Sequence, residues 1–290
     1  MLKQLRHKFY HWISDEPPLE EIIPFDFNRL KYEIRPGDVL LIEGRSIVSS
    51  VIRNITQSSW THAALYIGRI IDFEDKAIQE FLMQQVKNPK PHTRLIVEGL
   101  LNKGIILSTL SQYRHHHIRI CRPIGITPFD MHSVISYALR SVGTPYNVRH
   151  LLDLARFLLP WSILPRRWGS SLFRTRTGEP EPGICSSLIA EAFASIHFPI
   201  LPYIKQDSDK GTEWFQRNPY LFTPKDFDVS PYFEIIKYPL FDAATEEPYY
   251  RRLPWTKSGL VSQDKGILTE SGKRDRTKED DNHEKDTDEK

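Results

Sequence analysis

The 290-residue chain has little of three features that mark special classes of protein. Its two cysteines, Cys121 and Cys185, are too few for the disulfide framework of a small secreted domain. With 39 Lys and Arg against 37 Asp and Glu, no chain-wide positive charge attracts nucleic acid, and we expect no nucleic-acid partner. No run of about 18 uncharged apolar residues occurs, which argues against a membrane-spanning helix.

The first 18 residues, MLKQLRHKFYHWISDEPP, also lack the features of a secretory signal. Basic side chains are scattered through them, where a signal peptide has an apolar stretch followed by a small-residue cleavage site. Because the cysteine usage also fits a reducing compartment, we expect a cytoplasmic protein, on the inner face of a membrane if it binds lipid.

The composition supports one sizeable folded domain, since 40% of the residues are hydrophobic and 11% are aromatic. We assign this domain to residues 35–255, after an amphipathic and basic segment at 1–34. Residues 256–290 contain 8 basic and 10 acidic residues and no aromatic one. Such a segment cannot bury enough apolar surface to offset its chain entropy, so we expect a disordered charged tail.

Short apolar runs and helical periodicities predict an α+β domain with an antiparallel sheet. The predicted strands cover residues 38–42, 61–68, 94–98, 117–121 and 233–237, and the predicted helices lie at 46–55, at 127–143 and from 185 onward. For the helix at 46–55 we expect Ser46 to be the N-cap and the apolar side to pack on the core. Residues 69–93, with a helical pattern at 77–86, separate two strands more widely than a hairpin requires.

Cys185 falls in the first turn of a predicted helix, where unpaired backbone N–H groups and the helix dipole stabilise a thiolate. This is a favourable position for a nucleophile. The alternative is a small buried residue, because free cysteines are among the most buried residue types. Cys121 lies on a strand with no evident base, and we interpret it as structural.

His62 and Glu98 supply the two groups that a cysteine nucleophile requires. Each lies within an apolar strand, where a titratable side chain needs a reason to be. His62 is a candidate base, and Glu98 is a candidate acid to orient it. The alternative for each is a core polar group that only satisfies its neighbours' hydrogen bonds.

Five motifs occur in an order that resembles the YiiX/YaeF-like permuted papain-fold amidases, a branch of the NlpC-type cysteine hydrolases. They are GDVLL at 37–41, WTHAALYI at 60–67, VEG at 97–99, GTPYN at 143–147 and ICSSLI at 184–189. The resemblance implies a circularly permuted papain-like fold, in which an antiparallel sheet packs against the helix that carries the nucleophile. It also implies that Cys185 is the nucleophile, His62 the base and Glu98 the orienting acid. Tyr146 and Ser186 then lie at the oxyanion and substrate site.

These features lead us to expect a cysteine-dependent amidase or acyl hydrolase, or an acyltransferase, that works through an acyl-enzyme without a cofactor. The expected substrate contains an amide or an ester. A cysteine peptidase, a thioesterase and a catalytically silent lipid- or ligand-binding module remain as alternatives, and the sequence leaves the oligomeric state open.

An apolar and basic insertion at 149–178 suggests contact with a membrane and a lipid-linked substrate. Its candidate contact residues are Trp161, Arg166, Arg167 and Trp168, because tryptophans favour headgroup depth and arginines favour anionic lipid. The alternative is a core helix followed by a basic loop. We expect no metal site at His115, His116 and His117, since consecutive residues of a strand point to alternate faces.

Overall fold

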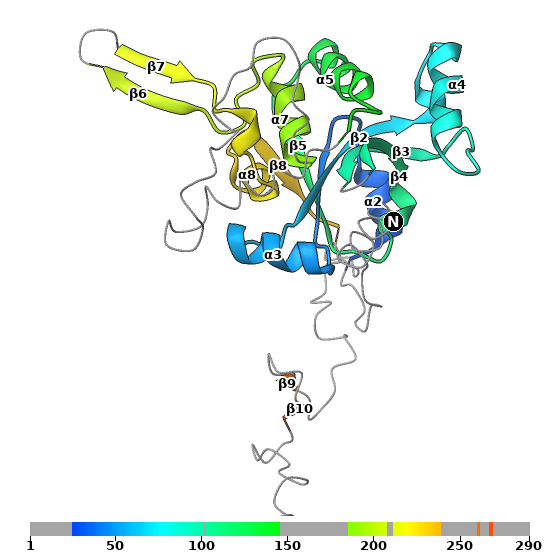
Figure 1. The fold of residues 1–290 in the computed structure, drawn as a ribbon, viewed down its shortest axis with the longest axis horizontal. Coiled ribbons are helices and arrows are strands. Elements are labelled where there is room, and N and C mark those ends of the chain that lie inside the picture. Colours follow the sequence, from blue (N-terminus) through cyan, green and yellow to red (C-terminus); the bar gives the residue numbers. More distant parts are fainter. Residues whose placement is uncertain are drawn as a thin grey trace, which may run out of the picture. The chain divides into compact units, whose positions relative to one another are not determined.

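The computed structural model describes residues 25–100, 103–145, 185–207, 211–238, 260–261 and 267–268. The chain forms two compact units, Met1–Leu240 and Phe241–Lys290. The first unit contains a six-stranded antiparallel sheet in the order β4-β3-β2-β1-β5-β8, with helices around it (Figure 1). The predicted α+β class with an antiparallel sheet is confirmed.

The strands of this sheet agree with the sequence prediction, apart from one that it missed. Their bounds are β1 Val39–Ile42, β2 His62–Arg69, β3 Arg94–Leu100, β4 Gly104–Thr109, β5 Ile118–Pro123 and β8 Phe233–Ile236. The missed strand is β4, with the sequence GIILST. A short apolar run of this kind cannot be assigned to a strand or a buried helix by periodicity alone.

Several of the helices begin after a residue whose side chain caps them, namely Asp26, Ser46, Asp75 and Thr127. The helix bounds are α2 Phe27–Glu33, α3 Ile47–Thr56, α4 Lys76–Gln85, α5 Pro128–Arg140, α7 Cys185–Ala194 and α8 Pro224–Val229, with 3-10 turns η1 Ile70–Asp72, η2 Leu110–Tyr113 and η3 Pro219–Leu221. Thr127 accepts a hydrogen bond from the Asp130 N–H, and Pro128 occupies the first helical position of α5. The helical pattern between the second and third strands corresponds to α4.

The sheet buries side chains on both faces. On β1, Val39 and Leu41 belong to a cluster that includes side chains of α4, α5, α7 and α8. Leu40 and Ile42 point to the opposite face and pack with side chains of α2 and η2. Because both faces are covered, β1 is an unbroken apolar run in which all four residues are buried.

The expected packing of α3 is wrong, although the helix and its Ser46 cap are present. Of its residues only Ser49 is buried, while Ile47 and Val51 are 45% and 50% exposed. The Ser46 and Ser49 hydroxyls hydrogen-bond each other at 2.9 Å in a buried position, whereas Val48, Ile52 and Ile55 are only half-buried. Periodicity identified the helix, but it carries no information about what lies against each side.

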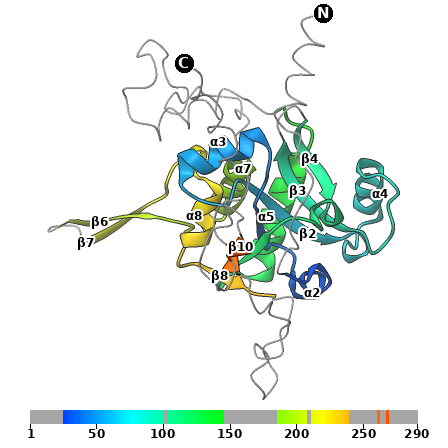
Figure 2. The same ribbon diagram turned by 90° about the horizontal axis from the view of Figure 1, so that it is seen from below.

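Two further antiparallel pairs lie outside this sheet. The hairpin of β6 Tyr203–Asp207 and β7 Gly211–Phe215 extends away from the six-stranded sheet in both views (Figures 1 and 2). In the second unit, β9 Leu260–Val261 pairs with β10 Ile267–Leu268. Among the described helices, none combines the length and apolar character needed to cross a membrane.

Candidate active site

Cys185 is the first residue of α7, and this helix is embedded in the core. The first six residues of α7 are all buried, and Phe193 lies in the same apolar cluster as strand residues of β1, β2 and β3. The apolar spacing after Cys185 therefore anchors the helix. This anchoring fixes the thiol at the N-terminal end of α7.

The Cys185 thiol is hydrogen-bonded to the His62 side chain. Its sulfur also accepts the backbone N–H groups of Ala63 and Ser186. Burial alone would raise the pKa of Cys185, but the charge and hydrogen bond of His62 and the two N–H donors lower it below its usual value. These contacts favour the thiolate.

His62 opens β2 and lies opposite Ile42 of β1 in the ladder. Its Nε2 is 2.7 Å from Oε2 of Glu98, which leaves Nδ1 as the ring nitrogen available to Cys185. Burial acts to lower the pKa of His62, yet the neighbouring Cys185 and Glu98 outweigh it and raise the pKa to about 10. The opposite shifts of the two pKa values describe a thiolate–imidazolium pair.

Glu98 lies on β3, paired with Ala64 of β2, and its side chain has no exposure to solvent. Gln112 Nε2 donates to Oε1 at 2.7 Å, and the Tyr113 hydroxyl donates to Oε2 at 2.5 Å. The Ser108 side chain also hydrogen-bonds this carboxylate. Burial would raise the pKa of Glu98, but His62, Ser108 and Tyr113 lower it, so the group stays ionised.

Three of the residues around Glu98 were not predicted from the sequence: Ser108, Gln112 and Tyr113. The available signal was weak: Gln112 and Tyr113 are polar residues that follow an apolar run, which is equally typical of a solvated turn. Their approach to Glu98 depends on β4 pairing with β3, and β4 was not predicted.

Of the remaining predicted site residues, only Ser186 lies in the part of the chain that the structure describes. The Ser186 backbone N–H reaches the Cys185 sulfur, whereas the Ser186 hydroxyl donates to the Phe222 carbonyl oxygen at 2.6 Å in a buried position. Ser186 therefore offers the site its backbone and not its side chain. Outside the described residues lie Tyr146 and the four candidate membrane contacts, Trp161, Arg166, Arg167 and Trp168.

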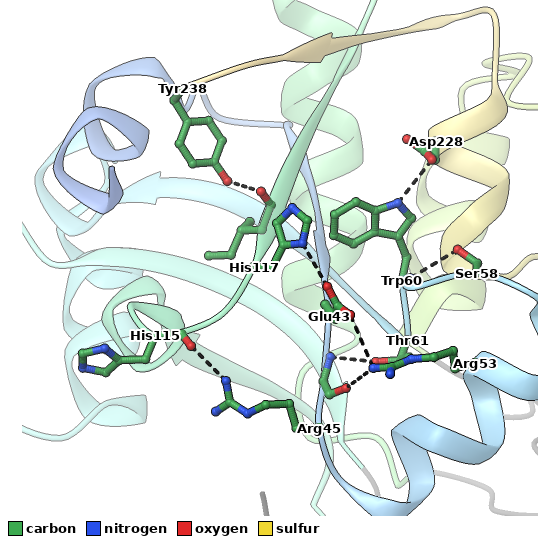
Figure 3. Close-up of polar contacts among 12 residues, drawn as sticks. Glu43, Arg45, Arg53, Ser58, Trp60, Thr61, His115, His117, Asp228 and Tyr238 are labelled. Atoms are coloured by element: carbon green, nitrogen blue, oxygen red, sulfur yellow. Dashed lines mark hydrogen bonds and ion pairs between the residues drawn. The ribbon is translucent and has the colours of Figure 1, made fainter. Parts of the chain in front are cut away.

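The chain segment just before His62 is held by a set of polar contacts (Figure 3). The Thr61 N–H donates to the Ile42 carbonyl oxygen at 3.1 Å, and the Thr61 hydroxyl oxygen accepts the Gly44 N–H at 2.9 Å. Trp60 Nε1 donates to Asp228 at 3.2 Å, while the Arg119 guanidinium lies 4.7 Å from the centre of a Trp60 ring. These contacts limit the backbone positions open to His62.

The triple histidine lies immediately before β5, the strand that was predicted to begin at His117. Strand β5 begins at Ile118, after the third histidine. His117 Nδ1 lies 2.9 Å from a Glu43 oxygen (Figure 3), and its ring stacks on Phe25 with centroids 4.4 Å apart. Within the described part of the chain, no three His, Cys, Asp or Glu residues gather in a way that would hold a metal ion.

Cys121 differs from Cys185 in every relevant contact. It is fully buried on β5, and burial raises the pKa of its thiol. Because a neutral thiol is a poor nucleophile, this environment gives Cys121 the inert character expected of a structural cysteine.

Residues 33–156 match the model of a family described as permuted papain-like amidase enzymes, YaeF/YiiX, C92 family. The resemblance drawn from the sequence motifs is confirmed. The matched stretch includes His62 and Glu98 and ends before Cys185. Members of this family are cysteine hydrolases, so the predicted class of enzyme, a cysteine hydrolase, is confirmed. The amidase activity of the family implies a substrate that contains an amide.

One similar solved structure is the crystal structure of the metalloprotein yiiX from Escherichia coli O157:H7. The two chains are 12% identical with a TM-score of 0.42, and the similarity covers 70% of this chain and 97% of that one. The comparison with curated proteins gives no match.

Proposed function

We propose that this protein cleaves an acyl amide with Cys185 as the nucleophile, His62 as the acid and base, and Glu98 as the group that orients His62. The observation that carries the proposal is the continuous chain of hydrogen bonds from Cys185 through His62 to Glu98. The pKa of Cys185 is lowered while that of His62 is raised, which is what an activated pair requires.

The reaction follows from these positions. The Cys185 thiolate attacks the carbonyl carbon, and the carbonyl oxygen becomes an oxyanion near the N-terminal N–H groups of α7. The His62 imidazolium gives its Nδ1 proton to the leaving nitrogen, the C–N bond breaks, and an acyl-enzyme remains. Water then attacks the thioester while neutral His62 takes its proton. The C–S bond then breaks, the carboxylic acid leaves, and the thiolate–imidazolium pair is restored.

The pH dependence of iodoacetamide alkylation at Cys185, followed by mass spectrometry, tests this proposal in the full chain. We expect rapid alkylation below neutral pH that is lost in His62→Ala, with Cys121 unreactive as the internal control. Equal and slow labelling of both cysteines would instead favour a silent binding module. Cys185→Ala is expected to abolish turnover of acyl amides and to keep the circular dichroism spectrum of the native chain.

Within the same proposal, the acyl group belongs to a lipid-linked amide or ester. The support comes from the sequence of the 149–178 insertion, whose tryptophans and arginines are typical of a segment at a membrane surface. Flotation of the protein with anionic vesicles tests this part. Absence of binding to phosphatidylserine vesicles at low salt would remove the lipid substrate and leave the amidase proposal intact.

A further inference from the structure

We infer that Gln112 and Tyr113, two consecutive residues of η2, are positioning residues that hold Glu98 in its ionised form and aim it at His62. The inference rests on the proposed function, because it concerns the acid that orients the proposed base. It assigns a role in the reaction to a 3-10 turn that carries no catalytic residue.

An ionised carboxylate is costly at the position of Glu98. The Glu98 side chain has no exposure to solvent, and a buried carboxylate without donors becomes neutral. Here Oε1 accepts from Gln112 at 2.7 Å, and Oε2 accepts from Tyr113 at 2.5 Å and faces His62 Nε2 at 2.7 Å. Protein donors thus replace water at both oxygens.

The hydrogen bond from Tyr113 also determines which nitrogen of His62 carries the proton. Tyr113 donates to Oε2, so this oxygen meets His62 only as an acceptor. His62 must therefore carry a proton on Nε2. Its other nitrogen, Nδ1, is then the one that exchanges a proton with Cys185.

The fold places both donors next to Glu98. Leu110 at the start of η2 is buried in the apolar cluster on the face of the sheet that α2 covers, and Tyr113 packs partly against the same cluster. The His116 ring meets the Tyr113 ring edge-on, with centroids 5.1 Å apart. Because β4 pairs with β3, the turn that follows β4 returns its side chains to the middle of β3, where Glu98 lies.

The loss of either donor has a defined consequence. With one hydrogen bond fewer, the buried Glu98 carboxylate takes up a proton at a higher pH. The neutral carboxyl group no longer stabilises the His62 imidazolium, and the Cys185 thiolate then loses its charged partner. A hydrogen bond to a charged group is worth about one pKa unit or somewhat more. We therefore expect the acid limb of Cys185 reactivity to move upward by about one pH unit.

The experiment compares full-length wild type with Tyr113→Phe and Gln112→Met by the pH dependence of Cys185 alkylation and by kcat and KM for an acyl amide. We expect the upward shift in both variants and a roughly tenfold lower kcat with KM nearly unchanged. Tyr238→Phe is the matched control, because it removes a buried tyrosine hydroxyl that donates to the Ile118 carbonyl oxygen. Its profile is expected to match wild type.

A double variant separates this inference from a merely structural role. If Tyr113 acts through Glu98, Tyr113→Phe has no further effect on the pH profile in a Glu98→Gln background. An unchanged profile in folded Tyr113→Phe, or a full additional shift in the double variant, would overturn the inference while leaving the proposed function standing. If Tyr113→Phe fails to fold, an unchanged profile in Gln112→Met overturns it, since Gln112 lies at the surface. Wild-type Cys185 without reactivity below neutral pH would overturn both.

Discussion

Cys185 and Cys121 are both buried, yet their surroundings move their pKa values in opposite directions. Burial acts on the two thiols in the same sense, so the difference comes from the neighbours. Cys185 has an imidazolium and two backbone N–H donors, whereas burial dominates at Cys121. At the residue scale, a few polar contacts and not exposure therefore set the pKa values of the two thiols apart.

The first prediction concerns the pH profile of amide hydrolysis. In the proposed reaction the reactive state has Cys185 as thiolate and His62 as imidazolium, so we expect activity to fall at low pH as the thiolate is protonated. At high pH it falls as His62 loses its proton, through its raised pKa of about 10. We expect a broad plateau of kcat/KM between these limits, measured with a chromogenic acyl amide. A profile with a single rise near pH 8.5 to 9, typical of an isolated thiol, would contradict it.

The second prediction concerns Glu98→Gln. The pKa of His62 is raised by Cys185 and, to a smaller extent, by Glu98, and the amide keeps the size of the Glu98 side chain but removes its charge. The imidazolium is then less stable, so the alkaline limb of kcat/KM moves to lower pH and kcat drops roughly ten- to a hundredfold. Stopped assays across the pH range measure both changes. Wild-type activity in Glu98→Gln would remove this residue from the reaction.

At the residue scale, Cys185, His62 and Glu98 could be selected from the sequence because each is a titratable side chain at an unusual position. Cys185 opens a helix, and the other two interrupt apolar strands. Gln112 and Tyr113 could not be selected in this way, because polar residues in a turn are ordinary. What makes them special is a buried carboxylate 14 and 15 positions earlier in the chain.

At the element scale, sequence patterns identified helices and strands better than they identified packing. The strands around His62 and Glu98 and the helix of Cys185 were predicted because short apolar runs and apolar spacing mark buried elements. Helix α3 shows the limit, since its apolar spacing is strong while Ile47 and Val51 stay exposed. The position of a helix relative to a sheet depends on the path of the chain, which no local pattern contains.

The third prediction tests whether α8 supports the segment that leads into β2. Asp228 of α8 accepts from Trp60 Nε1 and pairs with Arg119 of β5 at 2.5 Å (Figure 3 shows the Trp60 contact). Asp228→Ala leaves the mostly buried Trp60 N–H without this acceptor. We expect the free energy of unfolding to fall by about 1–2 kcal/mol in urea titrations.

The same variant is expected to lower kcat/KM, because Trp60 lies two positions before His62 and a looser backbone there misplaces the imidazole. Asp72→Ala is the control, since Asp72 forms a surface ion pair with Arg69 at the far end of β2. It should leave kcat/KM unchanged. An unaltered reaction rate in Asp228→Ala would mean that the His62 position does not depend on α8.

At the scale of the whole first unit, the sheet joins residues that are far apart in the chain. His62 and Glu98 come from adjacent strands, and Cys185 approaches from a helix that follows them by more than 80 positions. The order of histidine before cysteine is that of a permuted papain-like chain. The apolar clusters on both faces of the sheet hold these elements together. We therefore expect core packing to affect the site through the stability of the fold.

The last prediction separates that stability from the chemistry of the site. Phe193 is fully buried on α7, and its ring lies 5.2 Å from that of Phe198 and 5.4 Å from that of Phe233, centre to centre. Phe193→Ala removes this ring from the core, and we expect the free energy of unfolding to fall by about 3–5 kcal/mol. Phe129→Ala is the matched control, because Phe129 is 79% exposed and its loss should change stability little.

Phe193 is two turns from Cys185 along the helix, so the pH midpoint of Cys185 alkylation should stay at its wild-type value in the folded fraction. Equal unfolding energies for the two variants would contradict the arrangement of the core, and a shifted midpoint would show that the packing of α7 tunes the thiol directly.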